Sequence, residues 1–135
     1  MKKIKRKYYG NGKIRIEKYF DNNKLSRKDG PAVVEYYGNG NVWYEEYYKE
    51  GKLHREGKPA KIWYYFNGQL ECQRYYKEGK AHREDGPALI KYQYNGQIYL
   101  KEYYLNDKKL TFEEWIKETV DKNLKKHIEE EIELR

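Results

Sequence analysis

The sequence predicts a mainly β protein, an elongated single twisted antiparallel sheet of about four stacked 28-residue β-hairpin repeats capped by a C-terminal α-helix. Three observations lead to this prediction. Asn-Gly pairs recur every 28 residues, at Asn11, Asn39, Asn67 and Asn95, and Pro-Ala pairs keep the same spacing at Pro31, Pro59 and Pro87. After Leu110, apolar residues recur every three or four positions, which is typical of a helix.

Composition is consistent with one small ordered domain. The chain has 135 residues, 38% of them charged and 17% aromatic, including 17 tyrosines. Disordered chains are charged but poor in aromatic residues, so disorder is disfavoured. The lone cysteine, Cys72, excludes a disulfide framework and the usual zinc sites. No apolar run follows the N-terminus, so neither a signal peptide nor a membrane span is expected, and a cytoplasmic setting is the default.

The repeats set the predicted domain organisation, with an array over residues 1–110 and a helix over 111–135. An Asn-Gly pair favours a tight hairpin turn, so each unit should contain two antiparallel strands, about eight in all over residues 3–110. The units run roughly over 3–30, 31–58, 59–86 and 87–110. The first unit lacks its Pro-Ala pair and the fourth ends at Leu110, as capped arrays require.

Alternation along the strands predicts which side chains are buried. One packed face should contain Val34, Ile62 and Ile90 from the first strands and Tyr44, Cys72 and Leu100 from the second strands. Leu70 and Ile98 should also be buried on it, and Cys72 fills a core position there rather than acting as a reactive thiol. The opposite face should be solvated and carry columns of aromatic rings, among them a ladder of Tyr19, Tyr47, Tyr75 and Tyr103.

The C-terminal segment begins with clear helix signals. Thr111 and Glu114 form the pattern of a capping box, and Leu110 and Trp115 are placed as a hydrophobic staple. We expect four apolar residues to close the open face of the last hairpin: Phe112, Trp115, Ile116 and Val120. The later apolar residues, Leu124, Ile128 and Ile132, should project, either as a frayed end or as a partner-binding helix.

A family resemblance adds to this pattern. The strings Tyr36-Tyr37-Gly38-Asn39-Gly40 and Tyr47-Tyr48-Lys49-Glu50-Gly51-Lys52 resemble MORN-repeat variants. The joints over residues 53–60 and 81–88 are similar to a longer Leu-His-Arg-Glu-Asp-Gly-Pro-Ala subtype. The resemblance covers about residues 8–110 and implies a twisted sheet of stacked hairpins that acts as a scaffold or interaction module. Some similar bacterial proteins are antitoxin-like, and some relatives are viral.

Catalytic and metal-binding patterns are missing from the sequence. His54 and His82 lie one repeat apart, about 10 Å if each hairpin adds two strands, which is too far for one metal ion. They are expected instead to satisfy the loop backbone and to pair between units. No Ser/His/Asp, Cys/His or phosphate-loop arrangement is visible, so we expect a non-enzymatic protein without cofactor or metal.

Two binding functions remain open. The first is a protein-binding module, an inhibitor or antitoxin-like neutraliser whose target could be a nuclease or defence effector. Its candidate residues are Tyr37, Trp43, Trp63, Tyr65, Tyr47 and Tyr75, although the two tryptophans could equally serve cross-strand packing. The alternative is RNA or single-stranded nucleic-acid binding, in which bases stack on the aromatic face.

Charge bears on this choice. The formal net charge is +7, and the basic run Lys2, Lys3, Lys5, Arg6 and Lys7 would supply phosphate contacts. Lysine on an edge strand also prevents aggregation, and many glutamates interrupt the positive charge of the array. Protein binding is therefore favoured over nucleic-acid binding, membrane-surface binding is disfavoured, and the sequence does not indicate an oligomeric state.

Overall fold

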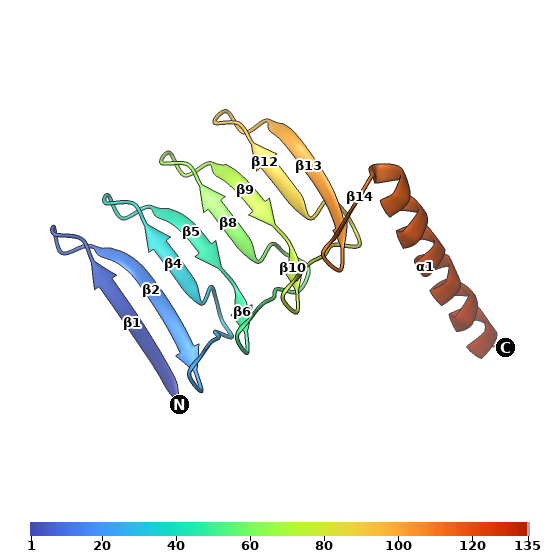
Figure 1. Cartoon of the computed structure of the whole chain (residues 1–135), viewed down its shortest axis with the longest axis horizontal. Helices are drawn as coiled ribbons and strands as arrows, with labels where there is room; N and C mark the ends of the chain where they lie inside the picture. The colour runs from blue at the N-terminus through green and yellow to red at the C-terminus, as the bar shows by residue number, and fades with distance from the viewer. Residues whose placement is uncertain (135) are drawn as a thin grey trace.

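A computed structural model describes residues 1–134 of the chain. Its main sheet is antiparallel throughout and follows the order β1-β2-β4-β5-β8-β9-β12-β13-β14, so consecutive hairpins lie side by side (Figure 1). The predicted architecture of stacked hairpins in one open sheet is confirmed. The eight long strands are β1 (Lys2–Tyr8), β2 (Ile14–Asp21), β4 (Val33–Tyr36), β5 (Val42–Glu46), β8 (Lys61–Tyr64), β9 (Leu70–Arg74), β12 (Leu89–Tyr92) and β13 (Ile98–Leu105).

The Asn-Gly pairs form the hairpin turns, as predicted. Gly40 has a φ of 93°, a conformation that side-chain-bearing residues rarely adopt. The side chain of Asn39 accepts a hydrogen bond of 3.0 Å from the backbone N–H of Asn41, which closes the turn locally. The same contact recurs at the other three turns.

A second row of short hairpins joins the repeats, and the sequence pattern did not predict it as strands. Each of these strands has two or three residues, too few for a period-two pattern to be visible. Backbone at positive φ turns the chain between them, for example at Glu50 and Gly51. The row comprises β3 (Lys24–Leu25), which pairs with β2, then β6 (Tyr48–Lys49) with β7 (Lys52–Leu53), β10 (Tyr76–Lys77) with β11 (Lys80–Ala81), and β14 (Lys108–Leu110), which pairs with β13.

A β-bulge interrupts each long hairpin near its turn. In the second hairpin Glu35 pairs with Tyr44 and Tyr36 pairs with Val42, which leaves Trp43 as the extra residue. The other hairpins have the same register shift. Their extra residues are Arg15, Glu71 and Tyr99.

The predicted single packed face is wrong. Residues directly opposite in antiparallel strands share a face, and Val34 lies opposite Glu45 whereas Trp63 lies opposite Cys72. Val34, Ile62 and Ile90 are therefore on one face of the sheet. Tyr44, Cys72 and Leu100 are on the other. The alternation of side chains within each strand was predicted correctly. The register between strands, however, decides which residues of neighbouring strands share a face.

Burial matches the predicted core in part. Ile62, Cys72 and Ile90 are buried as predicted, and Leu70 is half-buried. Ile98 is 47% exposed, so its predicted burial is wrong. It lies in the last long hairpin near the turn, where β13 pairs on its outer side only with β14, through residues 103–105.

The helix α1 (Phe112–Glu133) begins with the predicted capping box between Thr111 and Glu114. Trp115 is buried together with Leu110, as the predicted staple requires. The buried residue on the next turn is Thr119, not Ile116 or Val120. We predicted that these two residues and Phe112 would close the open face of the last hairpin together with Trp115. Only Trp115 does so, because the other three are exposed.

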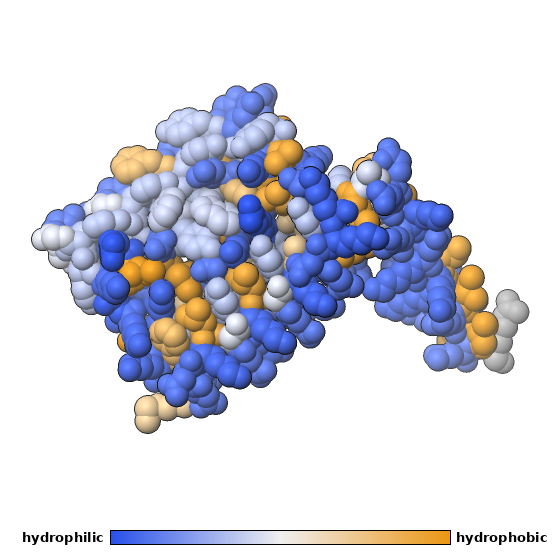
Figure 2. Space-filling model, in the orientation of Figure 1, coloured by the Kyte–Doolittle hydropathy of each residue, from blue (hydrophilic) through white to orange (hydrophobic). Residues whose placement is uncertain are grey.

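Beyond Thr119 no helix residue up to 134 is buried. Figure 1 shows α1 leaning away from the last hairpin, and Figure 2 shows hydrophobic atoms along its outer end. Leu124, Ile128 and Ile132 are exposed, as the predicted projection implies. No helix within residues 1–134 has the length and apolarity that crossing a bilayer requires. Residue 135, the last of the predicted helical segment 111–135, lies outside the described residues.

Candidate binding faces of the sheet

The register divides the sheet into two faces. We call the first the ladder face. It carries the row Glu17, Val34, Glu45, Ile62, Gln73, Ile90 and Lys101, together with Tyr19, Tyr47, Tyr75 and Tyr103. We call the second the variable face. It carries the row Ile16, Glu35, Tyr44, Trp63, Cys72, Lys91 and Leu100 and the row Lys18, Val33, Glu46, Lys61, Arg74, Leu89 and Glu102.

On the ladder face, an arginine covers a tyrosine ring in each of the first three repeats. The guanidinium carbon of Arg55 lies 3.8 Å from the centroid of Tyr47, and that of Arg83 lies 4.0 Å from Tyr75. Arg27 covers Tyr19 at 3.9 Å. Each arginine also donates a hydrogen bond to the carbonyl of the proline four residues later, which fixes the joint between repeats.

The helix completes this ladder in the fourth repeat. Thr111 stands where the earlier repeats have arginine, and the ring of Trp115 lies 4.9 Å from that of Tyr103 instead. The indole N–H of Trp115 donates to the carbonyl oxygen of Arg83 at 3.0 Å. Trp115 therefore takes the place of the missing arginine and holds α1 against the array.

Polar groups of the ladder face pair between neighbouring hairpins. The hydroxyl of Tyr64 donates to Glu45 at 2.8 Å, and that of Tyr36 donates to Glu17 at 2.6 Å. Burial alone would raise the pKa of Glu17, but the hydrogen bonds from Tyr36 and Arg6 outweigh it and lower that pKa below its ordinary value. Glu17 thus remains ionised inside the stack.

The histidines also belong to the joints. The Nδ1 atom of His54 accepts the backbone N–H of Glu78 at 3.0 Å, and its Nε2 atom lies 3.0 Å from a carboxylate oxygen of Glu56. His82 repeats the arrangement with Asn106 and Glu84, and Ser26 accepts the equivalent N–H in the first repeat. The prediction that these histidines satisfy the loop backbone is confirmed.

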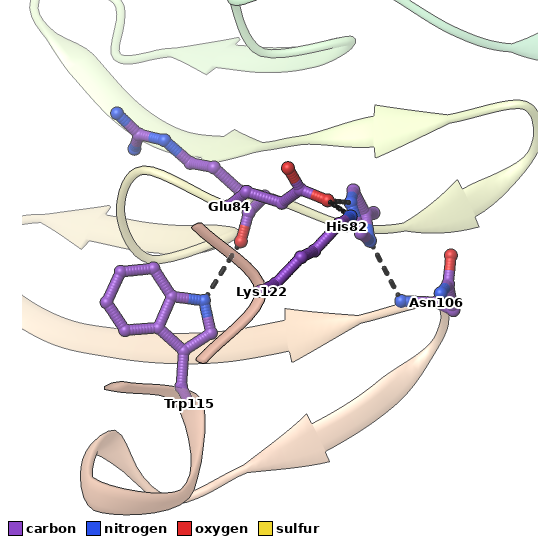
Figure 3. A network of polar contacts seen from close by, with 6 residues as sticks. His82, Glu84, Asn106, Trp115 and Lys122 are labelled. Atoms are coloured by element: carbon purple, nitrogen blue, oxygen red, sulfur yellow. Dashed lines mark hydrogen bonds and ion pairs between the residues drawn. The ribbon is translucent and has the colours of Figure 1, made fainter. Parts of the chain in front are cut away.

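Figure 3 shows how the helix joins this network. Lys122 of α1 pairs with Glu84, which also contacts His82. The hydrogen bond from Lys122 lowers the pKa of Glu84 below its ordinary value. The cluster therefore connects the third repeat, the fourth repeat and the helix, and it is a structural joint.

The predicted binding tyrosines lie at structural positions. Tyr47 and Tyr75 are half-buried under their arginines. The hydroxyl of Tyr37 donates to the carbonyl of Tyr64 at 2.7 Å, and that of Tyr65 donates to the carbonyl of Tyr92 at 2.8 Å. The hydroxyls of Tyr37 and Tyr65 tie one repeat to the next, and the rings of Tyr47 and Tyr75 pack against the arginine that fixes the following joint.

Trp43 differs from these tyrosines in its exposure, whereas Trp63 is half-buried and packs on Tyr44 of the preceding repeat. Trp43 is a bulge residue, 39% exposed, with its ring 6.2 Å from that of Tyr44. The ring of Tyr44 lies 4.8 Å from that of Trp63, so the three rings form one aromatic surface on the variable face. Phe66, beside Tyr37 at the next turn, is 57% exposed and extends the aromatic area.

Comparison of the repeats separates the two faces further. Positions of the ladder, such as Tyr47, and of the turns, such as Asn39, hold the same residue in all four repeats. The position of Trp63 holds Glu35 and Lys91 in the neighbouring repeats, and that of Trp43 holds Arg15, Glu71 and Tyr99. The stack therefore constrains the ladder face but leaves the variable face free to differ.

The predicted nucleic-acid residues do not form one patch. They lie in β1, an exposed edge strand, and alternate between its two faces. Arg6 is on the ladder face and pairs with Glu17 at 2.7 Å. Lys5 lies opposite Lys18 on the variable face, with Lys3 and Lys7 on the same side, while Lys2 alternates with them. Glu35 and Glu46 then interrupt this positive edge in the next hairpin.

A scan against protein-family models, a search of curated proteins and a search of solved structures each found no match. Among residues 1–134, no three histidine, cysteine, aspartate or glutamate side chains converge as metal ligands would.

Arg27, Arg55 and Arg83 recur at the 28-residue spacing of the ladder tyrosines, and this spacing is the sequence signal that predicts their shared position in the stack.

Proposed function

We propose that this protein is a non-enzymatic binding module that engages another protein through the variable face, with Trp43 and Trp63 as the central contacts. The observation that carries the proposal is the position of these two rings. They lie outside the ladder, at positions where neighbouring repeats have other residues, and Trp43 is substantially exposed.

Energetics favour aromatic anchors at such positions. Tryptophan, tyrosine and arginine are the residues that most often dominate protein–protein interfaces. The two aromatic residues bury a large area at low conformational cost, because each has only two rotatable side-chain bonds. Tyr44 and Trp63 support Trp43 from one side, so the surface is already ordered before a partner arrives.

The resemblance to MORN-repeat variants supports a narrower form of the proposal. Some similar bacterial proteins are antitoxin-like, so we propose a small cytoplasmic inhibitor or neutraliser, with a nuclease or a defence effector as the target. No chemistry is required of such a protein, since it acts by covering the target's own site.

Nucleic-acid binding is the second candidate, and the edge strand β1 is the observation that favours it. Five of its seven residues are basic, and all seven are exposed. Lys18 extends this charge to β2, but Glu35 and Glu46 stop it before the aromatic surface. A nucleic acid would therefore have to bind at the edge without stacking on Trp43 or Trp63.

An affinity pull-down from the native host, read by both protein and RNA identification, tests the two candidates. The proposal expects a protein to be recovered with the wild-type chain and to be lost with Trp43→Ala. Recovery of RNA that disappears when Lys3, Lys5 and Lys7 are reversed in charge, with no protein recovered, would support the second candidate and contradict the first.

A further inference from the structure

The third repeat and the neighbouring strand β12 of the fourth carry a cluster of positive charge on the variable face. We propose that Lys61, Arg74 and Lys91, grouped around Trp63, form a site for carboxylate side chains of an acidic partner protein. This inference rests on the proposed function and specifies the chemistry of the partner.

A like-charge pair across two strands is the first observation. Lys61 lies directly opposite Arg74 in the β8–β9 pair. Like charges in this arrangement destabilise a sheet. The equivalent pairs are Lys5 with Lys18 at the edge strand β1, Val33 with Glu46, and Leu89 with Glu102. The pair of Lys61 with Arg74 therefore differs from the other three, because it places two cations in the middle of the sheet beside Trp63.

Incomplete pairing of Arg74 is the second observation. Its Nε atom is buried and has no hydrogen-bond partner within residues 1–134. Its guanidinium carbon lies 5.4 Å from the centroid of Trp63, and the ammonium of Lys61 lies 5.9 Å from the same ring. The ring therefore has two cations beside it, and an anion between them would relieve their repulsion and supply the missing acceptor.

The acidic groups around the cluster are already engaged. Glu46 accepts a hydrogen bond from Tyr48 at 3.1 Å and lies 3.7 Å from Lys61. Glu102 pairs with Lys109 at 2.8 Å. Arg74 and Lys91 form no ion pair with any residue of the described chain, 1–134, so their charges are available to a ligand.

A cavity beside Arg74 indicates which kind of side chain lies next to the carboxylate in the partner protein. It has a volume of about 290 Å³, and its walls are apolar and cationic apart from Glu102, whose charge Lys109 already pairs, so it suits a carboxylate that follows an apolar side chain. Its lining on this face comes from Arg74, Tyr76, Leu89, Lys91, Glu102 and Tyr104.

The same arrangement favours an acidic protein over a nucleic acid. Glu46 and Glu102 lie on either side of the cluster and would repel a phosphate backbone that crosses the strands. Separate carboxylates spaced along a protein segment can reach the cations without passing these glutamates.

The test uses the full chain and a labelled probe. A fluorescein-labelled peptide of alternating glutamate and leucine serves as the acidic segment, and fluorescence anisotropy measures its affinity. A peptide of alternating glutamine and leucine and a single-stranded oligodeoxythymidine are the comparison probes. The variant is Arg74→Glu, which places at this position the residue that the second and fourth repeats have there. The matched control is Lys101→Glu, the same reversal on the ladder face.

We expect the wild-type chain to bind the glutamate peptide more tightly than the glutamine peptide. Arg74→Glu should weaken that binding by about tenfold or more, while Lys101→Glu changes it by less than about twofold. The Tm of Arg74→Glu should equal or exceed the wild-type value, because the like-charge pair is replaced by an opposite one.

Three results would overturn the inference: no preference of the wild-type chain for the glutamate peptide, equal binding by Arg74→Glu and wild type, or tighter Arg74-dependent binding of the oligonucleotide. The pull-down tests the proposed function separately from this inference. Loss of the host protein with Trp43→Ala but not with Arg74→Glu would keep the function and reject the acidic site.

Discussion

Replacing Trp115 with alanine should release the helix from the array. Trp115 is 7% exposed, its ring packs on Tyr103, and its N–H donates to Arg83. Removal of a buried aromatic ring costs about 3–5 kcal/mol, and the lost hydrogen bond leaves a carbonyl that water can reach. Because the helix lies at the end of the chain and can detach without unfolding the sheet, we expect the lower end, about 3 kcal/mol of the free energy of unfolding.

Urea unfolding followed by far-ultraviolet circular dichroism measures this loss. Phe112→Ala is the matched control, since that ring also contacts Tyr103 but is 50% exposed. The control should cost about 1 kcal/mol or less, because little apolar area is removed from the interior. Equal losses in the two variants would refute the view that Trp115 holds the last rung of the ladder.

Three further predictions concern the interior of the array. Ile90→Ala should cost about 2–5 kcal/mol in a chemical melt, whereas Ile98→Ala, at an exposed position, should cost less than about 1 kcal/mol; equal costs would contradict the face assignment. His54→Ala should lower stability by about 1–2 kcal/mol because the N–H of Glu78 loses its acceptor, while serine, the residue at this position in the first repeat, should restore part of it. Burial, with Glu46 next in effect, raises the pKa of Tyr48 from 10.0 to about 12, so the folded chain holds a proton that the unfolded chain loses; stability should be complete below pH 10 and fall as the pH rises toward 12. A pH series of thermal melts checks this, and constant stability across that range would contradict it.

Much of the fold was predictable because the local sequence signals, such as the Asn-Gly pairs, recur from repeat to repeat. The Asn-Gly turns, the hairpin order and the capping box of Thr111 depend on neighbouring residues only, and all were predicted. The assignment of Tyr44 and Val34 to one face failed, because it depends on register between strands, which the bulge at Trp43 helps to set. A two-residue strand such as β6 carries too little pattern to be seen.

The candidate site was less predictable than the fold. Aromatic content alone did not separate Tyr47, which an arginine covers, from Trp43, which is exposed. That separation needs the position of a side chain beyond the strand itself, such as Arg55 at the joint, eight residues after Tyr47. The charge cluster at Arg74 also depends on pairing, since Lys61 lies thirteen residues away in the chain and directly opposite in the sheet.

The central claim is that the variable face binds the partner while the ladder face holds the stack. Parallel measurement of partner recovery and of Tm for Trp43→Ala and Tyr75→Ala tests it most directly. Trp43→Ala should lose the partner and keep a Tm close to the wild-type value. Tyr75→Ala should lower the Tm, because Arg83 loses the ring that it covers, and should keep the partner when assayed below that Tm. Loss of the partner with Tyr75→Ala, together with full recovery by Trp43→Ala, would contradict the claim and place binding on the ladder face.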